Sequence, residues 1–398
     1  MGNPIVNLGN VFGSNTKKKS PDLSKYNPNL EKVRYADEHA ELFERKFKEK
    51  GGENHFGSLI KKGWKAWYYQ WGCICYNSTT NSAHEIYGDI YKKWQQLGGI
   101  RWGIPTTDES PCADGIGRYN HFCTESGMVL SIFWSPSSGA NGIYGEIRRR
   151  WVELGYERSY LGYPTTDEID FPDNGRANGF QNGDIYYWAD TGPIDMNNVK
   201  IFFTGLYCKQ ESAQDQSSNS DEPYVIIGVS SANSTASYTT PIFSDVDSHE
   251  SMPGWLEIYN GKPYGINLSA VVMENDFGDP NKFRDQIQSV LMTNHEIGTA
   301  ALGFIPVAGP LIAAIIGPAL GKLMPKIGDA INDLLGTEDD LVGSSNRVIS
   351  AKEMVLLSKT PPGFDNYIIN HFYMTIETKI NEATPAGSYR VYFQLIRD

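Results

Sequence analysis

Residues 86–109 read IYGDIYKKWQQLGGIRWGIPTTDE, and residues 143–168 read IYGEIRRRWVELGYERSYLGYPTTDE. Five apolar positions of the two stretches align at an offset of 57 residues, and their spacing places them on one helical face. Gly98 and Gly155 follow, where a helix C-terminus favours a left-handed residue. We interpret the stretches as copies of one structural unit. The aligned pairs are Ile86 with Ile143, Tyr87 with Tyr144, Ile90 with Ile147, Trp94 with Trp151, and Leu97 with Leu154.

The similarity extends beyond the helices. Gly117-Arg118 matches Gly175-Arg176, and each copy ends in a predicted strand pair, at Met128–Trp134 and at Asp184–Trp188. A partial earlier copy precedes them and ends near Tyr76. The sequence therefore predicts a repeat domain over residues 64–195, built of helix-plus-hairpin units.

This stretch resembles the LGFP tandem repeat. The resemblance rests on W-x-x-L-G at Trp94–Gly98 and Trp151–Gly155, on the two PTTDE runs, and on WSPSSGA at Trp134–Ala140. The family occurs in actinobacterial envelope proteins, joined to mycoloyltransferase or hydrolase domains, and is associated with attachment to the cell wall or its glycolipids. The resemblance implies a cell-envelope glycan or glycolipid as the partner, although the mycoloyltransferase domain is absent here.

Two interpretations of the polar repeat residues remain open. Asp108 and Asp167 are suited to fastening turns through side-chain-to-backbone bonds, and Arg118 and Arg176 would then pair with these acids. Alternatively, aromatic and arginine side chains line a groove for sugar or acyl groups, because aromatic rings offer a flat apolar face with a polar edge. The candidate ligand-binding residues are Trp102, Arg118, Trp134, Tyr163, Arg176 and Trp188.

Residues 196–398 predict a β-sandwich, because alternating apolar stretches occur at both ends of this region. The predicted strands are Asn198–Tyr207, Tyr224–Ser230, Tyr367–Glu377 and Ser388–Ile396. Taken with the repeats, this predicts an α+β multidomain fold: a helix-plus-hairpin repeat domain followed by a sandwich with a helical insert over 280–338.

Acidic residues fall at three loop positions of the predicted sandwich. Calcium takes six to eight oxygen ligands, mostly carboxylates, that converge from loops. Ser220–Val225, Glu274–Asp276 and Asp339–Gly343 resemble loops of the calcium-dependent phospholipid-binding sandwich of protein kinase C and synaptotagmin, which implies calcium as a cofactor and a phospholipid membrane as a partner. The alternative is that these carboxylates cap turns on a solvated edge. The candidate ligands are Asp215, Asp221, Glu274, Asp276, Asp339 and Asp340.

The predicted insert contains an uncharged run from Gly298 to Gly321. It is long enough to span a bilayer, but Pro306, Pro310 and Pro318 divide it into short pieces. It predicts either a buried helical insert or a stored membrane-inserting hairpin of the kind that pore-forming toxins use.

Residues 1–63 predict a polar arm followed by a helix over Leu30–Lys50, and the arm is a candidate for self-association. The chain is acidic, with a formal charge of -12, which argues against nucleic acid as a partner. The first residues carry no apolar run typical of a secretory signal, so we expect a cytoplasmic protein or release by another route.

Catalytic motifs such as G-x-S-x-G and H-E-x-x-H are absent from the sequence, so we predict no enzymatic activity. Two functions remain. The first is a non-enzymatic surface-binding protein that recognises an envelope glycan or glycolipid. The second is a membrane-active toxin that uses residues 298–321.

Overall fold

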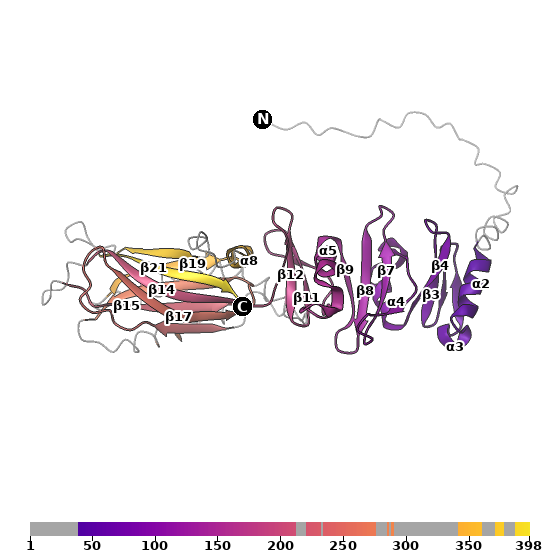
Figure 1. The fold of residues 1–398 in the computed structure, drawn as a ribbon, viewed down its shortest axis with the longest axis horizontal. Coiled ribbons are helices and arrows are strands. Elements are labelled where there is room, and N and C mark those ends of the chain that lie inside the picture. The colour runs from indigo at the N-terminus through magenta and orange to yellow at the C-terminus, as the bar shows by residue number, and fades with distance from the viewer. Residues whose placement is uncertain are drawn as a thin grey trace, which may run out of the picture. The chain divides into compact units, whose positions relative to one another are not determined.

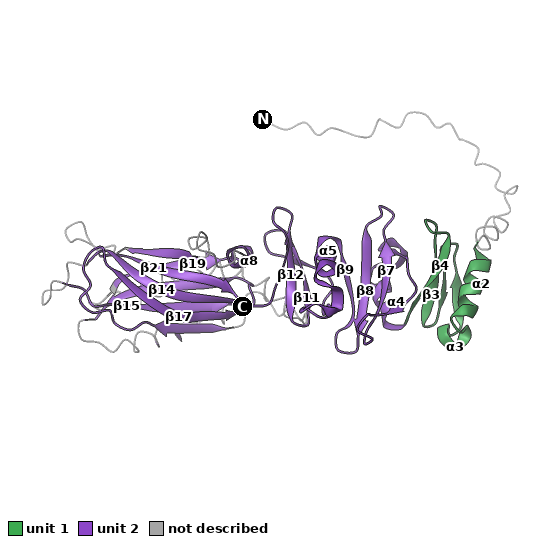
Figure 2. Cartoon of the chain, in the orientation of Figure 1, with its two compact units in different colours: residues 1–87 green, residues 88–398 purple. Residues whose placement is uncertain are grey.

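The computed structural model describes residues 39–211, 220–231, 234–275, 285, 288–289, 341–359, 371–377 and 387–398 (Figure 1). The N-terminal arm, with its predicted role in self-association, and the run Gly298–Gly321 lie outside these residues. The chain divides into two compact units, Met1–Tyr87 and Gly88–Asp398 (Figure 2). The predicted division at residues 63 and 195 stays a prediction. Among the described helices, none is both long and apolar enough to cross a membrane.

Unit 1 is a four-stranded antiparallel sheet packed against a short helix. The helix α2 covers Ala40–Glu49, within the predicted Leu30–Lys50 helix, and Gly51 and Gly52 adopt positive φ beyond its end. Its Phe43 is fully buried and contacts Trp67 at a ring-centroid distance of 5.2 Å. The elements are α2 (Ala40–Glu49), α3 (Glu53–Phe56), β1 (Leu59–Lys62), β2 (Ala66–Tyr69), β3 (Gly72–Asn77) and β4 (Ser82–Tyr87), with sheet order β1-β2-β3-β4.

Unit 2 begins with two further antiparallel sheets, each preceded by a ten-residue helix. The first sheet has the order β5-β7-β8-β9, with β6 paired to β7, and the second has the order β10-β11-β12-β13. The elements of the first are α4 (Gly88–Leu97), β5 (Ile104–Pro105), β6 (Ser110–Pro111), β7 (Arg118–Cys123), β8 (Val129–Ser135) and β9 (Gly139–Tyr144). Those of the second are α5 (Gly145–Leu154), the 3₁₀ turn η4 (Tyr156–Arg158), β10 (Ile169–Phe171), β11 (Gly175–Phe180), β12 (Gly183–Trp188) and β13 (Gly192–Met196).

The matched tryptophans anchor each helix to the sheet that follows it. Trp94 and Trp151 are buried, and their indole N–H groups donate to the carbonyl oxygens of Gly103 at 2.9 Å and Gly162 at 3.2 Å. The predicted left-handed end of the second helix is confirmed, because Gly155 has a φ of 107°. The two tryptophans that align in sequence therefore make the same packing and hydrogen-bonding contacts in their two repeats.

The predicted α+β fold class, with its helix-plus-hairpin repeats, is wrong, because the described residues are mostly strand. They form 21 strands and only five α-helices, and each repeat is built on a full antiparallel sheet rather than on a hairpin. The strands that the sequence does not indicate include β7 and β11, where the repeats show only the aligned Gly-Arg pairs at Arg118 and Arg176. Both pair with strands on their two sides, so each hairpin becomes part of a wider sheet.

Two four-stranded antiparallel sheets form the rest of unit 2, with the orders β17-β14-β21-β20 and β16-β15-β18-β19. Their inward side chains share one hydrophobic core, as in a β-sandwich. The same core includes Phe171, Tyr186 and Trp188 from the second repeat sheet. The elements are β14 (Val199–Gln210), β15 (Pro223–Ser231), β16 (Thr235–Thr239), β17 (Ser251–Gly261), β18 (Ile266–Glu274), β19 (Leu341–Ile349), α8 (Ala351–Lys359), β20 (His371–Glu377) and β21 (Ser388–Arg397).

Candidate functional site

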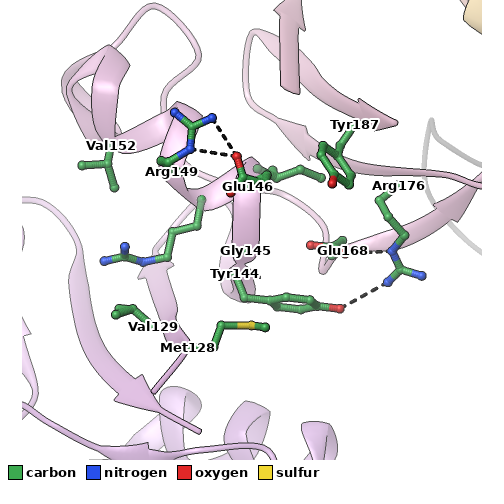
Figure 3. Close-up of a pocket in the computed structure, with 12 residues that line it drawn as sticks. Met128, Val129, Tyr144, Gly145, Glu146, Arg149, Val152, Glu168, Arg176 and Tyr187 are labelled. Carbon is green, nitrogen blue, oxygen red and sulfur yellow. Dashed lines mark hydrogen bonds and ion pairs between the residues drawn. The ribbon is translucent and has the colours of Figure 1, made fainter. Parts of the chain in front are cut away.

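A pocket of about 570 Å³ lies between the two repeats of unit 2, beside the first turns of α5 (Figure 3). Residues of both repeats form its walls, so neither repeat could make it alone. The lining residues are Met128, Val129, Tyr144, Gly145, Glu146, Ile147, Arg148, Arg149, Val152, Glu168, Arg176 and Tyr187.

A hydrogen-bonded wall is built around Arg176. Its Nε donates to Glu168 at 2.7 Å, and its Nη2 donates to the hydroxyl of Tyr144 at 3.2 Å (Figure 3). Its Nη1 pairs with Asp170. Burial raises the pKa of Glu168, and the adjacent Arg176 only partly offsets this effect. Burial also raises the pKa of Tyr144. The wall therefore presents phenol, carboxyl and guanidinium groups that are already held in place.

Apolar side chains lie on other sides of the same pocket. Met128 and Val129, at the start of β8, are both exposed although they are apolar, and Val152 of α5 also lines the pocket. Arg149 donates to Glu146 at 2.8 Å at the edge of α5 (Figure 3). The pocket thus combines an apolar surface with hydrogen-bonding groups, as ligand sites commonly do.

Side chains of each repeat form hydrogen bonds with the other repeat and fix the position of the pocket walls. Asp167 accepts from the backbone N–H of Gly142 at 2.7 Å and from Lys93 Nζ at 2.8 Å. Asn141 donates to the carbonyl of Pro164 at 2.9 Å, and Asn178 donates to that of Gly142 at 3.3 Å. The second repeat is therefore docked on strand β9 through polar contacts as well as through its core.

The predicted pairing of the repeat arginines with Asp108 and Asp167 is wrong by one position. Arg118 pairs with Glu109, and Arg176 pairs with Glu168. Threonines of the PTTDE runs also hold backbone groups of the following strands. Thr107 Oγ1 accepts from the N–H of His121, and Thr166 Oγ1 accepts from that of Gly179, both at 2.9 Å.

Of the six candidate ligand-binding residues, Arg176 lines this pocket and the other five do not. Tyr163 and Trp188 are buried, with Trp188 donating to the carbonyl of Pro172 at 2.9 Å. Trp102 and Trp134 are half-buried, and Arg118 is exposed. In the sequence Tyr144 and Glu168 stand out only as repeat positions, and no motif marks Tyr187, Met128 or Val129 as pocket residues.

Two of the six candidate calcium ligands are described, and both are buried. Asp221 accepts the hydroxyl of Tyr389, and Glu274 accepts the backbone N–H of Glu222. These carboxylates therefore already serve as acceptors inside the sandwich. Asp215, Asp276, Asp339 and Asp340 lie outside the described residues, so calcium binding stays a prediction.

Another group with metal-ligand atoms, among the residues that the structure describes, is Cys112, Asp114 and Glu157. Burial raises the pKa of the Cys112 thiol to about 12, which disfavours the thiolate that metals require. Asp114 accepts from the N–H of Ile116 at 2.9 Å and from the hydroxyl of Tyr163 at 2.7 Å. Hydrogen bonds within a turn and to the core therefore explain why these three side chains lie close together.

Arg148, which lines the pocket, also belongs to a network that makes stability sensitive to pH. Its Nε donates to Ser131 Oγ at 2.7 Å, and Ser131 Oγ lies 2.8 Å from His121 Nδ1. Burial, with a smaller contribution from the charge of Arg148, lowers the pKa of His121 from 6.5 to about 4. Between about pH 4 and pH 6.5, the unfolded chain therefore binds more protons at His121 than the folded protein does.

We expect the free energy of unfolding to be highest above pH 6.5 and to fall as the pH drops toward 4. Protonation of His121 should account for a loss on the order of 2 kcal/mol. The substitution His121→Gln removes the titrating group, so the free energy of unfolding of the variant should fall less over this pH range than that of the parent protein. Chemical denaturation of both proteins at pH 7, 5.5 and 4.5 measures the difference. Identical pH dependence in the two proteins would contradict the assignment.

The LGFP repeat family matches residues 103–159 and 161–202, which supply every residue that lines the pocket. No curated protein matches the chain. The match confirms the resemblance inferred from the tryptophan, glycine and PTTDE positions. The chain therefore carries LGFP repeats in the part of unit 2 that forms the pocket.

Proposed function

We propose that the chain is a non-enzymatic binding protein whose inter-repeat pocket recognises a glycan or glycolipid of a cell envelope. Its LGFP repeats indicate a cell-surface-associated protein. The identity of the ligand as a glycan or glycolipid is our inference from the chemistry of the pocket.

The observation that carries the proposal is the composition of the pocket walls. Tyr144 and Tyr187 offer rings of the kind on which sugars pack, because such rings have an apolar face and a polar edge. Glu168 and Arg176 present an acceptor and donors suited to sugar hydroxyl groups. Met128 and Val129 add apolar surface on which the acyl part of a glycolipid would fit.

The calcium and toxin hypotheses have less support. Calcium-dependent binding to phospholipid by the sandwich would require the four acidic residues outside the described ranges to complete a site with Asp221 and Glu274. The toxin alternative depends on residues 298–321, which also lie outside them. The described residues favour neither hypothesis over recognition by the repeats.

We expect Arg176→Gln and Tyr187→Ala to weaken binding to envelope glycans or glycolipids by about tenfold each, the loss expected from one charged hydrogen bond or one packed ring. The full chain, tested on an array of extracted envelope glycans and glycolipids, provides the measurement. Arg118→Gln is the matched control, because Arg118 makes the same glutamate pair in the first repeat but does not line the pocket. Equal losses in variant and control, or no binding by the parent, would reject the proposal.

A further inference from the structure

Apolar and basic side chains occur together on the exposed part of the hairpin formed by β1 and β2 of unit 1. The sequence from Leu59 to Lys65 is LIKKGWK. Ile60 is 69% exposed and Trp64 is 52% exposed, and Leu59 is exposed as well. Lys61 and Lys62 are exposed beside them. Large apolar side chains are thus presented to solvent together with positive charge.

The backbone of the hairpin places these side chains outward. β1 is the edge strand of its sheet, and its pairing with β2 is interrupted between Leu59 and Lys61, so Ile60 lies at an irregularity in the register. The N–H of Gly63 donates to the carbonyl of Ala66 at 2.9 Å, which leaves Trp64 and Lys65 as the two residues of the turn. A tryptophan therefore occupies the tip of the hairpin.

The basic side chains lie along aromatic rings. Lys62 Nζ lies 3.9 Å from the ring centroid of the buried Trp67, and Lys65 Nζ lies 4.7 Å from that of Trp64. These contacts place the ammonium groups over the faces of aromatic rings, as in cation–π interactions.

The corresponding turns of the other two sheets have a different chemistry. The turn between β6 and β7 contains Asp114, and the turn between β10 and β11 contains Asp173 and Asn174. The three sheets share their antiparallel order, so the combination of tryptophan and lysine is not a requirement of the fold. It is specific to the first sheet.

We propose that the β1–β2 hairpin is an interfacial anchor for an anionic lipid bilayer. Lysines contribute to binding at anionic membrane surfaces, and tryptophan favours the boundary between headgroups and acyl chains. The chain as a whole has a formal charge of -12, which would oppose this approach. At physiological salt, however, charges farther away than about 8 Å are largely screened, so the local lysines dominate. This inference does not depend on the ligand of the repeat pocket.

Co-sedimentation with vesicles tests the proposal on the full chain. We expect binding to vesicles of phosphatidylcholine with 30% phosphatidylglycerol at 0.15 M salt, and little binding to phosphatidylcholine alone. Because each surface lysine contributes roughly 1 kcal/mol, Lys61→Glu with Lys62→Glu should weaken binding by at least tenfold. Trp64→Ala should weaken it severalfold and at all salt concentrations, since its contribution is apolar.

Two matched controls separate the hairpin from general surface effects. Lys92→Glu with Lys209→Glu changes the net charge equally at exposed positions of unit 2, and Trp255→Ala removes a tryptophan that is 65% exposed. Both should bind vesicles like the parent. Circular dichroism and melting curves establish that all variants are folded.

Three outcomes would overturn the proposal. The first is no sedimentation of the parent with anionic vesicles, even at low salt. The second is binding that a soluble polyanion competes away and that Trp64→Ala leaves unchanged, which would indicate an acidic polymer as the partner. The third is a dimer that Ile60→Ser converts to a monomer without vesicle binding, which would assign the edge strand to a second copy of the chain.

Discussion

Replacing Trp151 by alanine is expected to lower the free energy of unfolding of unit 2 by about 3–5 kcal/mol, the usual cost of deleting a buried aromatic side chain. The indole is fully buried and packs edge-on against Phe133 at a centroid distance of 4.7 Å. It also contacts Tyr156 and Phe180, and its N–H donates to Gly162. Deletion would leave both a cavity and an unsatisfied carbonyl at the joint between helix and sheet.

Denaturant titration of the full chain, followed by fluorescence and circular dichroism, measures this loss. Trp255→Ala is the control, because that ring is 65% exposed and stacks on Phe202 at a centroid distance of 4.6 Å. Its cost should stay within about 1 kcal/mol. If Trp151→Ala and Trp255→Ala unfold alike, the repeat core is not organised around the tryptophans.

The sequence predicted the elements whose signals are local. The apolar spacing around Trp94 and Trp151 indicated both repeat helices, and the glycine after the second marked its end. Alternating apolar residues located β14, β15, β20 and β21 of the sandwich within a few residues. In each of these cases apolar residues of the element are buried in its own core, so the pattern is visible within a short window.

The remaining features depend on contacts between distant residues. β7 and β11 are strands because both of their neighbours pair with them, which no window around Arg118 or Arg176 shows. The pocket forms where Met128 of one repeat comes near Tyr187 of the next. The pairing of each repeat arginine with glutamate rather than with the preceding aspartate depends on strand geometry, which the PTTDE run does not encode in its spacing.

The junction between the second repeat and the sandwich also depends on contacts between residues that are distant in the sequence, here at a charged side chain. Asp195 on β13 accepts from Tyr160 at 2.6 Å, from Arg150 Nε at 2.7 Å and from Arg397 at 3.2 Å. These partners come from the turn that follows η4, from helix α5 and from the end of β21, so three separate segments meet at one carboxylate. The charge of Asp195 therefore joins the repeat to the sandwich.

The protonation of Asp195 follows from these contacts. Burial alone would raise its pKa, but the hydrogen bonds from Tyr160 and Arg150 and the positive charges of Arg150 and Arg397 outweigh burial and hold the pKa below its usual value. A carboxyl group with a lowered pKa in the folded state stabilises the protein above about pH 4, and this stabilisation is lost as the pH falls through the lowered pKa.

We expect Asp195→Ala to cost about 3–4 kcal/mol at pH 7, the lower part of the range for breaking a buried ion pair, because both arginines keep some contact with water.

Asp190→Ala is the matched control. Asp190 also joins the second repeat to the sandwich, through an ion pair of 2.7 Å with Lys352, but its side chain is 67% exposed whereas that of Asp195 is 7% exposed. An exposed pair contributes little, so the control should lose no more than about 1 kcal/mol. Denaturation at pH 7 compares the two variants. Equal losses would show that burial of the Asp195 carboxylate does not strengthen this junction.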